Sequence, residues 1–184
     1  MKKIFTLIAI VLIASTSTFA QKYFSRTGHV NFFSDTKMED IKADNNKATV
    51  IVDAASGAVE FSLLIKSFEF EKALMQEHFN ENYMESDTYP KASFKGKIDN
   101  ITAVNFKKDG TYNSTVTGDM TMHGVTKKIT INVTIKVASG KITATSKFQV
   151  VPEDYKIVIP NTVRDNIASK IDVTVDATLE ELKK

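Results

Sequence analysis

The residues best suited to chemistry are three histidines, His29, His78 and His123. Three imidazole side chains can in principle hold a zinc ion. No two of them have the i, i+4 spacing that places two ligands on one helical face, and no acidic residue stands at a recognisable ligand offset. We therefore expect no metal site, and we expect each histidine to form local hydrogen bonds at the surface or a rim. His123 precedes Gly124, which predicts that it shapes a hairpin corner.

Other catalytic patterns are missing from the sequence. The chain has no cysteine nucleophile and no Gly-x-Ser-x-Gly elbow. Its seven glycines are scattered at expected turns, so they form no phosphate-binding loop, and the absence of tryptophan argues against a sugar-binding platform. The sequence therefore predicts a protein that is not an enzyme and that carries no cofactor.

Charge and composition narrow the class of partner. The 184 residues are 42% hydrophobic and 25% charged, which is ordinary for a globular chain of one domain. Lysine and arginine number 24 against 22 aspartate and glutamate, and the excess of two consists of Lys2 and Lys3 at the start of the chain. The rest is balanced in charge. We expect no binding to nucleic acid, because phosphate affinity needs clustered positive charge.

Residues 1–20 have the pattern of a secretory signal peptide. A short basic start precedes an apolar run from Ile4 to Ala14, and Thr18-Phe19-Ala20 offers small residues where a signal peptidase cleaves. The alternative is a membrane anchor, but the apolar run is short for about 30 Å of hydrocarbon. We predict cleavage before Gln21, no stable membrane anchor, and a periplasmic or secreted protein. The mature domain would span residues 21–184.

Alternation with a period of two dominates the remaining chain. From Ile129 to Val137, apolar residues fall on one face and polar residues on the other, which is typical of antiparallel sheet. Ser139-Gly140 predicts a two-residue turn after this strand. The sequence predicts eight or nine strands, at 24–33, 47–54, 57–66, 91–99, 102–108, 113–122, 126–137, 142–150 and 171–179.

Two segments break the alternation. Residues 71–82 have the spacing of a short amphipathic helix, followed by a loop that ends at Tyr89-Pro90. Residues 151–168 are irregular and predict a helical turn at 161–166. We expect the insertion at 71–89 to cover one end of the sheet structure, with Glu77 and Glu81 in water.

Antiparallel strands with one apolar face form a closed barrel or a sandwich. Eight strands that close leave an interior that side chains fill or that holds one slender ligand. An outer-membrane barrel would alternate as well, with its apolar face toward lipid. The polar faces here mix lysine with aspartate and glutamate, which favours a barrel with the apolar face inside.

Two motifs resemble those of the YceI-like family. Tyr89-Pro90-Lys91-Ala92-Ser93-Phe94 is similar to its Tyr-Pro-x-x-x-Phe strand entry, and the segment from Val116 to Lys127 is similar to its Val-Thr-Gly-Asp-Leu-Thr-x-His-Gly-Val-Thr-Lys hairpin. The similarity extends from about Tyr23 to Leu179. The resemblance implies an extended, eight-stranded, lipocalin-like antiparallel β-barrel that is exported to the periplasm. It also implies a binding protein that encloses a polyisoprenoid or a similar long-chain lipid.

One stretch departs from the family pattern. Many members carry Arg-Asp-x-His-Leu in the helical insertion, where this chain has Met75-Gln76-Glu77-His78-Phe79. The histidine is retained and the arginine is not. If that arginine holds an anionic head group in the family, a neutral ligand or a different anchor becomes more plausible here. The chain also lacks the Gly-x-Trp opening of true lipocalins, so its likeness to them concerns architecture alone.

Large apolar side chains on the inner face are the candidate ligand-binding residues. A lipid cavity needs bulky groups without hydrogen-bonding demands, and flexible methionines adapt to a chain. A filled core would use the same residue types, so the resemblance decides for the cavity. The candidates for its lining or mouth are Phe32, Phe61, Leu74, His78, Phe79, Phe94, Met120, Met122, Ile131, Val133 and Phe148.

Three functions are compatible with this pattern. The first is a carrier that sequesters a long-chain lipid, either a polyisoprenoid or an isoprenoid-quinone-like molecule. The second is an enzyme that acts on an isoprenoid-type substrate, with His78 as the acid–base residue. The third is a structural or stress-response protein with a packed core and no ligand. We favour the carrier, and a homodimer remains open.

Overall fold

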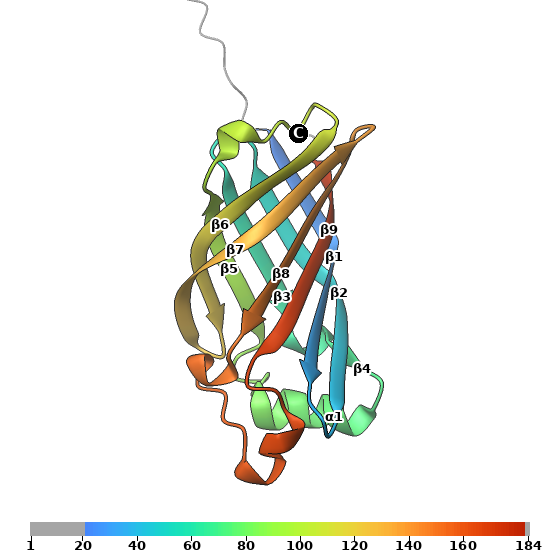
Figure 1. Ribbon diagram of the computed structural model, residues 1–184, viewed down its shortest axis with the longest axis vertical. Helices are drawn as coiled ribbons and strands as arrows, with labels where there is room; N and C mark the ends of the chain where they lie inside the picture. Colours follow the sequence, from blue (N-terminus) through green and yellow to red (C-terminus); the bar gives the residue numbers. More distant parts are fainter. Residues whose placement is uncertain (1–20, 183–184) are drawn as a thin grey trace, which may run out of the picture.

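The computed structural model describes residues 21–182, and these form an elongated β-barrel (Figure 1). The expected signal peptide at 1–20 lies outside the described residues. The strands are β1 (Lys22–Asp35), β2 (Asp40–Asp53), β3 (Ala58–Leu64), β4 (Glu69–Phe70), β5 (Lys91–Ile98), β6 (Gly110–Met122), β7 (Val125–Ala138), β8 (Lys141–Val150) and β9 (Ile171–Glu181).

The sheet closes through β1, which pairs antiparallel with both β2 and β9. Around the barrel the order is β1-β9-β8-β7-β6-β5-β3-β2, so the chain runs up and down between neighbours. The two-residue β4 adds to one end of β2 alone. The predicted eight-stranded antiparallel barrel is confirmed, and a sandwich is excluded, because every strand of the barrel has a partner on both sides.

Two expectations for the strands were wrong. Residues 102–108 are not a strand: a short 3-10 helix (Ile101–Ala103) and a loop stand there, and the Phe106 ring stacks on Tyr23 at 5.1 Å between centroids. Apolar residues recur in this segment because it packs across one barrel end. β2 starts at Asp40 instead of 47, since its first half is mostly polar and alternation there rests on Ile41 and Ala43 alone.

Two hairpins close with the same backbone geometry. His123 and Gly124 have φ of 49° and 72°, and Ser139 and Gly140 have φ of 50° and 79°. Two consecutive positive φ angles give the turn whose twist matches that of the flanking strands. Both predicted turns are confirmed.

The two halves of the barrel interior differ in packing. At the end that Phe106 covers, inward side chains such as Ile135 and Ile142 are each 2% exposed. Toward the opposite end, Val173 and Val175 on β9 also point inward, yet they are only half-buried. The half near Phe106 is packed more closely, and the other half surrounds the larger open space.

Two irregular segments cover the open half. Helix α1 (Ala73–His78) and the π-helical turn η2 (Phe79–Tyr83) lie across this end of the barrel, beside the segment that holds the 3-10 helices η4 (Pro152–Tyr155) and η5 (Asn161–Asn166) (Figure 1). The predicted helix at 71–82 and helical turn at 161–166 are confirmed. Among residues 21–182, no helix has the length and apolar character needed to cross a membrane.

His123 connects the hairpin at this end to both covering segments. Its Nδ1–H donates to the Tyr155 carbonyl at 3.0 Å, and its Nε2 lies 3.7 Å from Glu85 Oε1. The Tyr89 ring packs edge-on at 4.6 Å between centroids, and the His123 side chain is 9% exposed. His123 therefore lies at the rim of the barrel, as expected, and two loops fold over its side chain. His29 does remain at the surface, with Nε2 2.8 Å from Asp44 Oδ1.

The register of β7 predicts opposite outcomes for charges on its two faces. Ile135→Asp should lower the free energy of unfolding by about 3 kcal/mol or more, because the carboxylate would be buried without a partner. Thr130→Asp, on the exposed face of the same strand, should be mild. Thermal unfolding followed by circular dichroism compares them. Equal losses of melting temperature would contradict this register.

The position of His123 predicts a specific rescue. His123→Ala should cost about 1–3 kcal/mol, because the buried Tyr155 carbonyl loses its donor. His123→Asn should retain most of the stability, since asparagine offers an amide N–H at a similar position and tolerates positive φ. Amide exchange of residues 152–157 together with the melting temperature measures both variants. Equal destabilisation by alanine and asparagine would contradict the role of this hydrogen bond.

Candidate functional site

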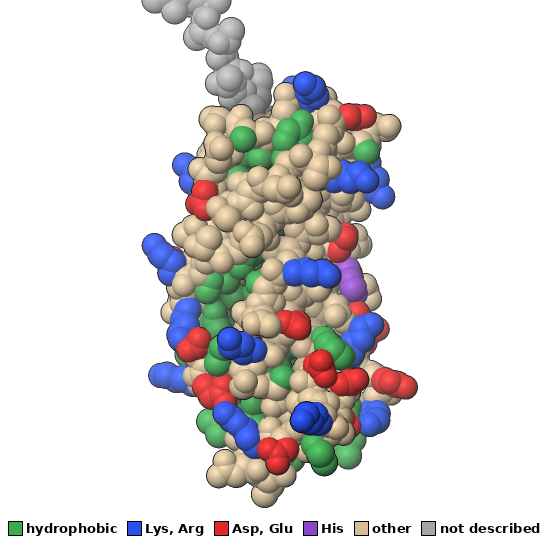
Figure 2. Space-filling model, in the orientation of Figure 1, with side chains coloured by type: hydrophobic (Ala, Val, Ile, Leu, Met, Phe, Trp, Pro, Cys, Tyr) green, Lys and Arg blue, Asp and Glu red, His purple; other side chains and the backbone are tan. Residues whose placement is uncertain are grey.

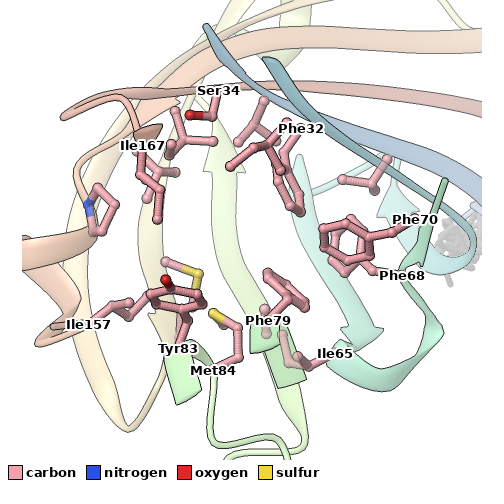
Figure 3. A pocket seen from close by; sticks show the side chains of 18 of the residues that line it. Phe32, Ser34, Ile65, Phe68, Phe70, Phe79, Tyr83, Met84, Ile157 and Ile167 are labelled. Carbon is pink, nitrogen blue, oxygen red and sulfur yellow. The ribbon is translucent and has the colours of Figure 1, made fainter. Parts of the chain in front are cut away.

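The open half of the barrel holds a cavity of about 300 Å³. Its walls come from inward residues of the strands, and its cover comes from α1, η2 and the segment between β8 and β9 (Figure 3). Phe32 and Ser34 line it from β1, while Phe79, Tyr83 and Met84 face them from the cover. The cavity is therefore enclosed jointly by the sheet and by the two covering segments.

A second cavity of about 110 Å³ lies next to the first, toward the packed end. The two share part of their lining, so together they form one apolar interior. The shared residues are Phe61, Ala92, Met120, Phe148 and Val175. An extended chain that enters the first cavity would reach the second between these side chains. A fully packed interior, the third of the functional alternatives, does not match this geometry.

Nearly all of the lining is apolar. The polar exceptions in the larger cavity are Ser34, Glu39, His78, Tyr83 and Asn166. The Ser34 hydroxyl oxygen accepts the Ala168 N–H at 2.9 Å, so its group is satisfied within the fold. Burial raises the pKa of Tyr83, which keeps its phenol protonated and neutral. A long hydrocarbon chain fits such a lining because it asks for no hydrogen bonds.

Most of the sequence-predicted residues line these cavities. Phe32, Phe61, His78, Phe79, Met120, Met122 and Phe148 line the larger cavity, and Phe61, Phe94, Met120, Ile131, Val133 and Phe148 line the smaller one. Leu74 is the exception, because its side chain is 61% exposed and does not contribute to either lining. Helix α1 faces the cavity with Met75, His78 and Phe79, which have i, i+3, i+4 spacing. Leu74 directly precedes Met75 in the helix, so its side chain points about 100° away from the face that lines the cavity.

Sequence reasoning missed the lining from the segment between β8 and β9. Ile157, Ile159, Val163 and Ile167 all reach the larger cavity. The available signal was a run of apolar residues in a stretch too irregular for a strand, which must be buried against something. Without the barrel end in place, that partner could not be named.

Phe79 fixes the helical cover to the barrel. Its ring lies 5.4 Å from Phe32, 5.6 Å from Phe68 and 5.1 Å from Phe70, measured between centroids. Each such aromatic pair contributes about 0.5–1.5 kcal/mol beyond the burial of area. Phe32 comes from a barrel strand, so this cluster joins cover and wall. This group of rings is thus one attachment of the cover to the barrel.

The site offers little for acid–base or metal chemistry. His78 is exposed at the margin of the cavity, and within residues 21–182 no carboxylate is hydrogen-bonded to it. In the same part of the chain, no three histidine, cysteine, aspartate or glutamate side chains are grouped as metal ligands. What the geometry can do is remove an apolar chain from water.

The comparisons with known proteins agree on the fold. A polyisoprenoid-binding domain from Saccharophagus degradans implicated in plant cell wall breakdown superposes with a TM-score of 0.75 at 15% identity, covering 89% of this chain and 99% of that one. BcnA of Burkholderia cenocepacia gives 0.68 at 16% identity, covering 83% and 96%. The YceI protein of Campylobacter jejuni gives 0.53 at 18% identity, with both chains covered completely.

The comparison of sequences identifies the family. None of the curated proteins compared with this chain matches it. The family profile of the YceI-like domain, however, matches residues 13–179, which is most of the chain. The two motifs that resembled this family lie on β5 and its entry and on the β6–β7 hairpin, at the covered end of the barrel. The chain therefore belongs to the YceI-like family.

Proposed function

We propose that this protein is a non-enzymatic carrier that sequesters one long apolar chain, of isoprenoid type, inside its barrel. The observation that carries the proposal is the apolar cavity of about 300 Å³, which shares lining residues with a second of about 110 Å³. Transfer of hydrocarbon from water into such a site yields about 0.8 kcal/mol per buried CH₂ group. A barrel closed at one end and covered at the other provides that burial along the length of a chain.

The isoprenoid character of the ligand is supported by likeness to other proteins. The domain from Saccharophagus degradans, which shares this fold, is described as polyisoprenoid-binding. Methyl-branched chains also suit the present lining, in which isoleucine, valine and methionine surround the space. The methionines Met75, Met84, Met120 and Met122 can adapt their side chains to the branches.

Export to the periplasm or beyond is part of the proposal. The basic start, the apolar run and the small residues before Gln21 support a cleaved signal peptide. A carrier is useful in such a compartment because long isoprenoid chains do not cross water unaided. A protein that acts between membranes needs an interior site with a cover that opens.

The alternative of an enzyme with His78 as an acid–base residue has weaker support. His78 is exposed at the edge of the cavity, and no carboxylate of the described residues orients it by a hydrogen bond. General acid–base catalysis needs a group held within reach of the reacting proton. Turnover of the bound lipid that disappears in His78→Ala would favour this alternative.

Native mass spectrometry of protein purified from its own host tests the carrier. We expect an added mass of several hundred daltons, typical of an isoprenoid lipid. Val175→Phe should abolish the adduct, because the ring enters the space where the two cavities meet. Thr178→Phe adds the same ring on the exposed face of β9 and should retain it.

The same spectra decide further points. A measured mass equal to that of the chain from Gln21 onward supports cleavage of the signal peptide. The charge-state series reports whether a homodimer forms. Bare wild-type protein, or an adduct that Val175→Phe leaves in place while the fold persists, would contradict the proposed site.

The aromatic cluster predicts that Phe79 controls retention of the ligand. Phe79→Ala removes three ring contacts and should release the cover locally, so the lipid should dissociate at least about tenfold faster. Leu74→Ala is the matched control on the same helix, because Leu74 does not line the cavity. Lipid transfer to acceptor vesicles and amide exchange over residues 73–83 provide the measurements. The opposite outcome is a large loss of melting temperature in Phe79→Ala with no faster release of lipid from the folded variant. That result would mean that α1 supports the core and does not act as a cover.

A further inference from the structure

Polar groups at the covered end of the larger cavity gather around Glu39. This residue lies in the turn between β1 and β2 and contributes to the cavity lining. Its Oε1 accepts a hydrogen bond from Lys72 Nζ at 3.1 Å, and its Oε2 accepts one from Asn166 Nδ2 at 3.4 Å. Lys72 directly precedes α1, and Asn166 ends η5. One carboxylate therefore connects the barrel to both covering segments.

The described lining of both cavities lacks the lysine or arginine that would balance an anionic ligand. Within residues 21–182, neither lysine nor arginine lines either space, and Glu39 is the sole carboxylate that does. Hydrogen bonds from Lys72 and Asn166 hold the pKa of Glu39 below its ordinary value, so it is ionised at neutral pH. The fixed charge within the lining is negative.

Four basic side chains at this end form ion pairs with acidic partners. Lys72 pairs with Glu39 itself, and three further cations of the covering region form ion pairs. These pairs are Lys66 with Asp87, Lys127 with Asp154, and Arg164 with Glu153. The space-filling view shows basic and acidic side chains interspersed over the visible face (Figure 2).

Glu39 retains hydrogen-bonding capacity for a ligand. A carboxylate has about four lone-pair sites, and Lys72 and Asn166 occupy two of them. A hydroxyl that enters between the covering segments can donate to Glu39. A phosphate or carboxylate group instead brings further negative charge and further hydrogen-bond acceptors next to the Glu39 carboxylate. The negative charge of Glu39 repels such a head group and attracts the hydroxyl hydrogen of an alcohol.

We propose that the ligand ends in an uncharged head group that donates a hydrogen bond to Glu39, as an isoprenoid alcohol does, and that Glu39 excludes chains ending in phosphate or carboxylate. This inference rests on the proposed function, because it assumes that the apolar cavity holds the chain. It specifies the ligand class of that site. It makes Glu39 the residue that selects the head group.

Three probes with one chain test it, namely geranylgeraniol, its methyl ether and its monophosphate. The ether removes only the donor, and the phosphate adds charge. We expect the delipidated protein to bind the alcohol about fivefold more tightly than the ether, which is the value of one hydrogen bond. We expect the monophosphate to bind at least about tenfold more weakly than the alcohol. The dissociation constants come from displacement of a fluorescent lipid probe. Each compound is used below its critical micelle concentration.

Variants assign the discrimination to Glu39. In Glu39→Gln the ratio of phosphate to alcohol affinity should rise toward one, because the amide keeps an acceptor and loses the charge. Asp87→Asn is the matched control, since it removes one negative charge at the same end from an exposed side chain that does not line the cavity. The ratio in Asp87→Asn should remain that of the wild type.

Each other outcome has a distinct meaning. Monophosphate binding as tight as that of the alcohol would overturn the head-group inference while leaving the carrier intact. Equal binding of alcohol and ether would overturn the hydrogen bond to Glu39. An unchanged ratio in Glu39→Gln would assign the discrimination elsewhere and overturn the role of this residue. Failure of all three probes to bind the wild type would overturn the proposed function itself.

Discussion

Closure of the sheet through β1 is the constraint on which the rest of the structure depends. Because β1 pairs with β2 on one side and β9 on the other, none of the eight barrel strands of residues 21–182 has a free edge, and every inward face shares one interior. A closed barrel of eight strands has a fixed width, so the volume inside is set before the side chains fill it. What the protein can enclose then depends on how many inward positions carry large groups.

The two ends of the barrel use that volume differently. At one end the Phe106 loop packs on Tyr23 and the inward residues touch each other, which gives a rigid base. At the other end a second group of packed residues leaves a larger space between the strands, and the cover is built from short helical turns. Three different interactions attach this cover. Phe79 contributes aromatic contacts, His123 donates a buried hydrogen bond, and the Glu39 carboxylate accepts hydrogen bonds from the cover. Because these contacts are few, ligand exchange requires only the cover to move.

Much of the fold and part of the site could be predicted from local patterns. The alternation along β7 and β9, the turns at His123-Gly124 and Ser139-Gly140, and the period of the 71–82 helix all act between residues close in sequence. Inward phenylalanines such as Phe32 and Phe148 followed from strand parity alone. Residues 102–108 misled the same reasoning, because burial against a barrel end produces apolar spacing without a strand. Leu74 misled it because the part of a short helix that is buried depends on its exact rotation over the barrel.

By itself the sequence determined the period of each element, the turns between them and the face of each strand that avoids water, since these depend on neighbouring residues. Only the tertiary structure decided whether the inward side chains meet or leave a cavity, because that depends on the barrel width and on segments far apart in the chain. It also brought Glu39, Lys72 and Asn166 together from three separate loops. No local pattern marks such a cluster, because its members share a site only after the sheet has closed and both covering segments have folded over its end.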